Sequence, residues 1–322
     1  MLFACFAFNA GGAPCVAEEG NDAGSPRSLL DLDMDGQLHE YLDMMLQDEK
    51  DESGQGKKAL KPVDRSYTVF RYQHSKLFTA DPYPVAPGHV QVKTSYFFVT
   101  ADRAFGPPPG FQPLVPYTEH VGRLAVEAGV ARNLDLGVTA GTGVLDTPRL
   151  SPADTTMHFY SLFSIWQLWS SQDNQAAIAY TPTFFYVFGR RDNPLLFSPS
   201  KNDYAFDNRI TLNKDIGALN LTNNLDIGFI TIFGDQAPCL TGIFTANLAS
   251  GYQIGNWLQP EIEIGYFHES IPGLPVTDAL LLSGGVLVFY KNFRLEIGGA
   301  QVVVGSNIDN VTIGLVSLAY TF

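Results

Sequence analysis

Over most of its length the chain alternates hydrophobic and polar residues in short segments, which turn-forming residues separate. In the most regular segment, Leu219, Leu221 and Leu225 alternate with Asn220 and Asn224. A period of two residues predicts β-strands, because successive side chains of a strand point to opposite faces of the sheet. The pattern therefore predicts a protein built almost entirely of β-strands.

Twelve segments of this kind follow one another, and the fourth is the least regular. The first segment contains Val90, Val92, Tyr96 and Phe98 on one face. The other eleven fall near 118–131, 134–144, 156–169, 175–188, 204–214, 218–232, 240–252, 258–268, 277–290, 293–304 and 310–322. Each is about as long as a tilted strand that crosses a bilayer. An even number of strands, with connections that alternate between tight turns and longer loops, is typical of bacterial outer-membrane barrels.

Alternating strands also build soluble sandwiches and lipocalin-like barrels, which turn their apolar faces inward. The chain has 23 Phe and 14 Tyr, more aromatic residues on long strands than one small core would hold. Only 16% of the residues are charged, and the polar faces are rich in Gly, Asn and Thr. We therefore predict an all-β, transmembrane, antiparallel up-and-down barrel in the outer membrane, with apolar faces against lipid and polar faces inside.

This orientation places a set of charged side chains in the barrel lumen. They are Lys93, Glu119, Arg123, Glu127, Asp135, Asp207, Arg209, Asp226, Glu261, Glu263, Arg294 and Glu296. Two interpretations remain open. Such groups select which solutes enter a pore, or they pair across strands and make the lumen rigid.

The amino-terminal part of the sequence differs from the rest. Residues 1–17 resemble a secretory signal peptide, with an apolar run followed by small residues. Residues 18–80 are acidic and polar, and apolar residues at helical spacing predict one amphipathic helix near 37–48. We expect 18–80 to be a periplasmic extension and 81–322 to be the barrel.

An acidic motif stands just before the predicted helix. Asp31, Asp33 and Asp35, followed by Gly36, resemble the first half of a calcium-binding loop, because Ca²⁺ prefers several oxygen ligands around a sharp turn. Leu42 occupies the twelfth position, where such loops have a bidentate Glu. The other interpretation is an acidic start of a helix, where Asp caps free backbone N–H groups. No other cofactor is predicted.

The last predicted strand ends in an aromatic residue. Val316, Leu318, Tyr320 and Phe322 share one face of this strand. This ending resembles the carboxy-terminal signal of outer-membrane proteins, and the resemblance implies the barrel-assembly machinery as a partner. The two aromatic residues would also lie in the aromatic girdle of a membrane barrel.

Net charge and cysteine spacing exclude some functions. The formal net charge is −13 with an isoelectric point near 4.8, so nucleic acid is not expected as a partner. Cys5, Cys15 and Cys239 do not have the spacing of a metal site.

One short motif allows an enzymatic alternative. His268 and Ser270 lie two residues apart on one face of the ninth segment, where a histidine could activate a serine. Outer-membrane lipid hydrolases resemble this arrangement. However, no Asn or Gln follows at a comparable place to orient the imidazole, and Pro272 interrupts the strand. We therefore do not expect an enzyme.

Two stretches carry a resemblance to a known family. Asp81 to Val90 reads DPYPVAPGHV, and Val121 to Gly141 reads VGRLAVEAGVARNLDLGVTAG. Together they resemble the outer-membrane transporters grouped under the meta-pathway of phenol degradation. The resemblance implies a channel for passive uptake of small molecules, aromatic or hydrophobic ones included. The alternatives are the lipid hydrolase described above and a structural barrel without transport.

Overall fold

The computed structural model describes residues 76–105, 116–146, 156–171, 175–189, 203–216, 219–234, 241–270 and 276–322. The predicted signal peptide, the helix near 37–48 and the motif of Asp31, Asp33 and Asp35 lie outside the described residues. The strands are β1 (Val90–Phe105), β2 (Tyr117–Ala131), β3 (Leu134–Asp146), β4 (Thr156–Ser170), β5 (Ala176–Gly189), β6 (Asp203–Ile216), β7 (Leu221–Gly234), β8 (Thr241–Tyr252), β9 (Leu258–Ser270), β10 (Thr277–Tyr290), β11 (Phe293–Ser306) and β12 (Ile308–Thr321).

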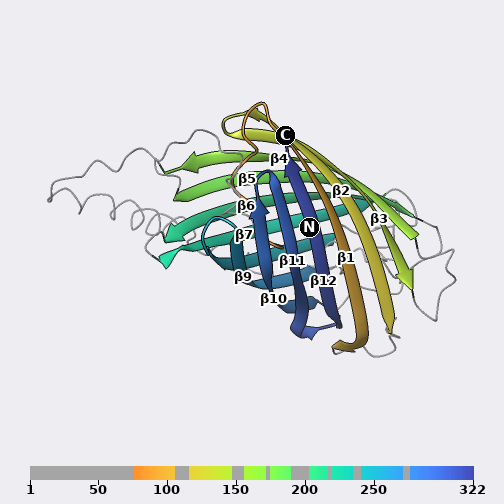
Figure 1. Cartoon of the computed structure of the whole chain (residues 1–322). Coiled ribbons are helices and arrows are strands. Elements are labelled where there is room, and N and C mark those ends of the chain that lie inside the picture. The colour runs from red at the N-terminus through yellow and green to blue at the C-terminus, as the bar shows by residue number, and fades with distance from the viewer. Residues whose placement is uncertain are drawn as a thin grey trace, which may run out of the picture. The chain divides into compact units, whose positions relative to one another are not determined.

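These strands form one closed antiparallel barrel, which confirms the predicted fold class. Each strand pairs with the next in sequence, and β12 pairs with β1 to close the ring (Figure 1). Closure gives every strand two neighbours, so the sheet has no unpaired edge. The segment predicted to be least regular is β4, and its pairing with β5 shifts register between Gln167 and Trp169. No helix in the described part of the chain is long and apolar enough to cross a membrane.

The two ends of the barrel differ in their connections. One end holds the start of β1, the end of β12 and the tight turns; we call it the terminal end. Two of these turns contain a residue with positive φ, Asn220 at 52° and Lys291 at 51°, a conformation that asparagine adopts more readily than most residues. The other end, which we call the loop end, is where the longer connections leave the strands, apart from the tight turn at Asn307 between β11 and β12.

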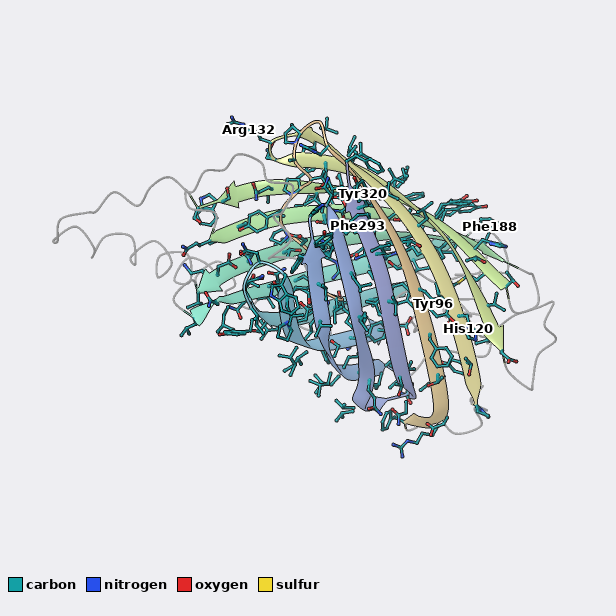
Figure 2. All side chains as sticks on the ribbon, in the orientation of Figure 1. Tyr96, His120, Arg132, Phe188, Phe293 and Tyr320 are labelled. Atoms are coloured by element: carbon teal, nitrogen blue, oxygen red, sulfur yellow. The ribbon has the colours of Figure 1, made fainter. Side chains whose placement is uncertain are left out.

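The outer face of the barrel is apolar, with aromatic side chains near both ends. Near the terminal end, the ring of Tyr320 lies 4.6 Å from that of Phe293 and 4.7 Å from that of Phe322. Near the loop end, Tyr96 and His120 contact each other on β1 and β2 (Figure 2). Leu, Ile and Val side chains between the two groups are exposed. This is the distribution of a barrel with an apolar band between two aromatic girdles.

The two halves of the inner face differ in polarity. Toward the terminal end it carries most of the charged residues predicted for the lumen, whereas toward the loop end it is lined mainly by a buried apolar cluster. Phe97, Ile243, Phe267, Ile313 and Leu315 belong to this cluster. In the loop-end half the outer face is apolar as expected, but the expectation of a polar inner face is wrong for much of it. Side chains of this cluster pack against one another inside the barrel, which removes apolar surface from water.

Candidate functional site

A segment of the chain that precedes β1 lies inside the barrel. We call residues 76–87 the strap. The strap reaches the inner walls of β3, β6, β7 and β9, and it leads into β1 at the terminal end. Residues 76–80 belong to the stretch predicted as a periplasmic extension, and they contact the inner wall of the barrel. The periplasmic placement of 18–80 stays a prediction.

Carboxylates of the barrel wall hold the strap by its backbone. Glu261 accepts a hydrogen bond from the N–H of Leu77 at 2.5 Å. Glu263 accepts bonds from the N–H groups of Phe78 and Thr79, at 3.0 and 2.9 Å, and from the Thr79 hydroxyl at 2.8 Å. Hydrogen bonds to an ionised group contribute about 1.5–3 kcal/mol each, roughly twice as much as neutral ones. Two adjacent glutamates therefore anchor one end of the strap.

Further polar contacts continue along the strap. Asp226 accepts a bond from the N–H of Ala80 at 2.9 Å, and Asn224 donates to the carbonyl of the same residue at 3.0 Å. Asp135 accepts from the N–H of Val85 at 3.0 Å. The strap is not part of the sheet, so its backbone N–H and C=O groups have no partners in neighbouring strands. These bonds supply partners for them, as buried backbone groups require.

Glycines make room for the strap on the part of the wall next to Glu261. Gly285 of β10 and Gly298 of β11 are cross-strand partners, and both face the lumen. The side chain of Leu77 packs against them, and a Cβ at Gly285 would lie 2.7 Å from its Cδ1 atom. A larger residue at either glycine would displace the Leu77 side chain. We call this pair the glycine notch, because it sets how closely the strap approaches the barrel wall.

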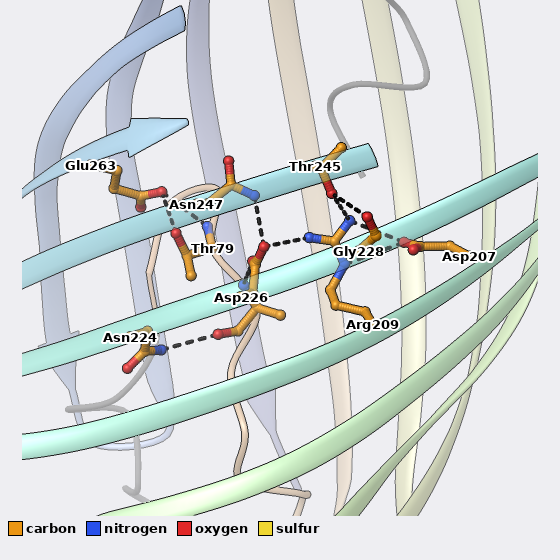
Figure 3. Close-up of polar contacts among 10 residues, drawn as sticks. Thr79, Asp207, Arg209, Asn224, Asp226, Gly228, Thr245, Asn247 and Glu263 are labelled. Atoms are coloured by element: carbon orange, nitrogen blue, oxygen red, sulfur yellow. Dashed lines mark hydrogen bonds and ion pairs between the residues drawn. The ribbon is translucent and has the colours of Figure 1, made fainter. Parts of the chain in front are cut away.

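A buried ionic network lies beside the strap at mid-barrel. Arg209 of β6 donates to Asp226 at 2.7 Å and to Asp207 at 3.0 Å (Figure 3). Asn247 donates to the same oxygen of Asp226 at 2.7 Å. Asp226 is fully buried, and its other oxygen binds the strap. Asp226 therefore connects the strap to the arginine network.

A second charged group occupies the wall formed by β11, β12, β1 and β2. Lys93 and Arg294 both contact Glu296, at 2.7 and 2.8 Å. Arg123 lies in the same cross-strand row as Glu296, with Ser317 and Ser95 between them. Its guanidinium is 5.5 Å from the ring centre of Phe97 and 3.4 Å from the Ser95 hydroxyl. We call Lys93, Arg123, Arg294 and Glu296 the cationic cluster, because it contains three cations and one carboxylate.

All twelve charged residues predicted for the lumen lie on the inner face of the barrel. The structure brings eleven of them into the terminal-end half, where they form the groups described above. Glu127 of β2 completes this set, and it lies diagonally across from Asp135 of β3. Glu119 is separate from the rest, because it lies beside Gly143 in the loop-end half. The pairing across strands is extensive, and whether these groups also select solutes stays a prediction.

Sequence reasoning missed the residues that complete these groups. Asn213, Asn224 and Asn247 face the lumen and bind the strap or its anchors. Strand alternation alone would have placed these three inside. Nothing in the sequence signalled the strap, whose contacts with the barrel wall join residues from 50 to 185 positions apart in the chain.

The residues of the enzymatic alternative lie on the outer face near the loop end. His268 Nδ1 is 2.9 Å from Asp278 Oδ1, and the Tyr266 hydroxyl donates to the same oxygen at 2.6 Å. Asp278, on the neighbouring strand, therefore supplies the orienting group that the sequence did not reveal. Ser270, in the described part of the chain, has no hydrogen bond with His268. The serine is thus not activated in this arrangement.

The predicted assembly residues lie on the outer face of β12. Val316, Leu318 and Phe322 are exposed, and Tyr320 is half-buried between aromatic neighbours. The backbone of Phe322 continues the pairing with β1, since its N–H donates to the carbonyl of Val90 at 2.8 Å. Their role as an assembly signal stays a prediction. Among the described residues, no group of three or more His, Cys, Asp or Glu side chains could hold a metal ion.

Comparison with solved structures finds the same architecture. The COG4313 outer membrane channel from Pseudomonas putida F1 aligns over 77% of this chain and 100% of its own, with a TM-score of 0.62 and 14% identity. The barrel is similar to a solved outer-membrane channel. The β domain of the Bordetella autotransporter BrkA gives a TM-score of 0.47 at 11% identity, over 73% of this chain and all of that one. The KdgM porin gives 0.41 at 12% identity, over 71% and 99%.

At these identities the likeness shows the fold. No protein-family model matches the chain, and no curated protein matches its sequence.

Proposed function

We propose that this protein is an outer-membrane channel for the passive uptake of small molecules, aromatic or hydrophobic ones included. The closed barrel with an apolar outer face supports a place in the outer membrane, because only closed barrels and helices satisfy their backbone in lipid. The likeness to the COG4313 outer membrane channel supports a channel role. The terminal end would face the periplasm, as short turns do in such barrels.

The observation that carries the substrate class is the apolar lining of the loop-end half of the lumen. A hydrophilic solute would lose its hydration against Phe97, Phe267 and Leu315, whereas a hydrophobic one would gain contacts there. The resemblance to the meta-pathway transporters of phenol degradation supports the same class. Signal-peptide export and insertion by the barrel-assembly machinery complete the proposal.

We expect purified protein in liposomes to admit small aromatic and aliphatic alcohols faster than sugars of similar size. The reason is the cost of desolvating polar hydroxyl groups against the apolar lining. Swelling of liposomes, with protein-free liposomes subtracted for direct permeation, measures the two rates. Faster entry of sugars would contradict a hydrophobic pathway, and no entry of either would contradict a channel.

A structural barrel without transport is the second candidate, and the strap favours it. The strap and the apolar cluster together fill much of the lumen, as in a plugged barrel. Current through planar bilayers separates the two candidates, since a permanently plugged barrel passes none.

The lipid-hydrolase alternative has one favourable observation, the contact of Asp278 with His268. Because Ser270 does not contact His268, we expect no release of fatty acid from phospholipid by the purified protein. A fluorescent phospholipid assay measures this, with Ser270→Ala as the matched variant. Hydrolysis by the native protein that disappears in Ser270→Ala would contradict the expectation.

A further inference from the structure

The inner face of β3 carries little side-chain volume. From the terminal end to the loop end, its inward-facing residues are Asp135, Gly137, Thr139, Gly141, Gly143 and Leu145. Three of these positions are glycines, which have no side chain to fill the space in front of the backbone. Side chains of a neighbouring strand can therefore lie over β3.

Two phenylalanines of β4 use this space. Phe163 is the cross-strand partner of Gly137, and Phe159 is the partner of Gly141. A Cβ atom at either glycine would overlap the tip of the partner's ring. Each ring therefore reaches sideways over the backbone of β3, and it does so because the facing residue is glycine.

The two rings also border accessible space in the lumen. Phe163 lines a cavity of about 280 Å³ beside the strap, together with Thr139 of β3. Phe159 and Phe163 are half-buried, whereas Ile243 of β8 and Phe267 of β9, on the opposite wall, are fully buried. The β3–β4 wall thus offers a solute ring surface that these two residues of the opposite wall do not.

A buried hydroxyl group lies between the two rings. Ser161 faces the lumen between Phe159 and Phe163 on β4, and only 3% of it is exposed. Its Oγ atom has no hydrogen-bond partner in the part of the chain that the structure describes. A buried hydroxyl without a partner is unfavourable, so a solute that brings a hydroxyl group to this place would stabilise it.

Charges of both signs flank the same wall. Arg123 and Glu127 of β2 are the cross-strand partners of the two glycines on their other side. Asp135, on β3 itself, accepts hydrogen bonds from backbone N–H groups of the strap and of β4. Because both signs are present, we attribute selection at this wall to shape and hydrogen bonding rather than to charge.

We propose that solutes pass mid-barrel along the β3–β4 wall, where Phe159 and Phe163 set the width of the pathway and Ser161 binds a hydroxyl group of the solute. Gly137 and Gly141 take part by giving the rings their places over β3. The proposal rests on the proposed function and names its substrate class, which is slim, unbranched alcohols. A branched alcohol would meet the rings before its hydroxyl group reaches Ser161.

Swelling of liposomes that contain the purified full chain tests the width of the pathway. The probes are linear hexanediol, with a hydroxyl group at each end, and pinacol, its branched isomer. Both have the same composition and the same number of hydroxyl groups, so they differ in shape. With protein-free liposomes subtracted, we expect hexanediol to enter several-fold faster than pinacol, and equal rates overturn the width assignment.

Replacing both phenylalanines locates the restriction. The double variant Phe159→Ala with Phe163→Ala is expected to raise the entry rate of pinacol several-fold and to bring it close to that of hexanediol. Phe229→Ala removes an exposed ring from the outer face of β7 and is the matched control, which should keep the native ratio. A double variant with the native ratio overturns the assignment.

A larger residue in β3 changes the pathway in the opposite direction. Gly141→Val is expected to push the Phe159 ring into the lumen and to lower the entry rates of both diols several-fold. Gly122→Val is its control, because a Cβ atom at Gly122 would meet no atom within 4 Å. If Gly141→Val admits both diols as its control does, the ring does not border the pathway.

Ser161→Ala tests the hydrogen bond. We expect it to slow the entry of hexanediol by about two- to tenfold, the scale of one hydrogen bond. Ser270→Ala, at an exposed position, is the matched control and should admit hexanediol at the native rate. An unchanged rate in Ser161→Ala overturns the hydroxyl contact.

The same measurements separate this proposal from the proposed function. Entry of neither diol through the native protein contradicts the channel function, and the pathway falls with it. Entry of both diols at equal rates, unchanged in the phenylalanine variant, contradicts the pathway alone and leaves the channel function in place.

Discussion

Replacing Glu261 and Glu263 together with alanine is expected to raise the time-averaged single-channel current of this barrel several-fold. The two carboxylates accept four hydrogen bonds from the strap, three from backbone N–H groups and one from a hydroxyl. At about 1.5–3 kcal/mol for each charge-assisted bond, even a partial loss shifts the equilibrium between seated and released strap by orders of magnitude. Recordings in planar bilayers at constant salt measure the change.

Glu119→Ala is the control for this experiment. Glu119 is also a buried lumen carboxylate, but it lies in the loop-end half and does not bind the strap. We expect its current to remain close to that of the native protein. If the double variant conducts no better than Glu119→Ala, the strap is not what limits the current.

The second large effect is expected from Arg209→Ala. This change leaves Asp207 and Asp226 buried next to each other without their cation. Removing one partner of a buried ionic group typically costs about 3–5 kcal/mol, because the remaining charge is left uncompensated. Urea unfolding of the protein in lipid vesicles measures the change in free energy.

The matched variant is Arg132→Ala, which removes an exposed arginine from the turn between β2 and β3. Exposed charges contribute little, so its unfolding free energy should change by less than about 1 kcal/mol. If Arg209→Ala lowers the unfolding free energy as little as the control does, then water, rather than Arg209, stabilises the two aspartates.

The strands could be predicted from the sequence because their pattern is local. β10 was predicted at both ends, and β7 was predicted three residues early because Asn220 forms a turn with positive φ instead of extending the strand. The bulge in β4 was anticipated as irregular alternation, although its position was not. A membrane strand needs alternation, length and a turn, and each of these can be read from neighbouring residues.

The interior could be predicted only in part. Alternation placed Asp135, Arg209 and Glu263 on the inner face, but it could not show which of them contact one another across the barrel. The same reasoning assigned apolar side chains to the outer face, although Ile313 and Leu315 pack inside the barrel. Local sequence does not reveal whether an inward position meets water or another wall, because that depends on the barrel diameter and on what fills it.

The strap is held mainly through its peptide N–H groups, which every residue except proline possesses. Related chains could therefore diverge widely along this stretch and still obstruct the pore, so long as the acids of the wall persist. Evolutionary constraint would fall on the barrel's acidic residues, on the glycine notch and on Leu77, which fills the notch, whereas strap residues that bind only through their backbone would tolerate more substitutions. A proline arising at 77, 78, 79, 80 or 85 would be the exception, since each of these residues donates one of those bonds.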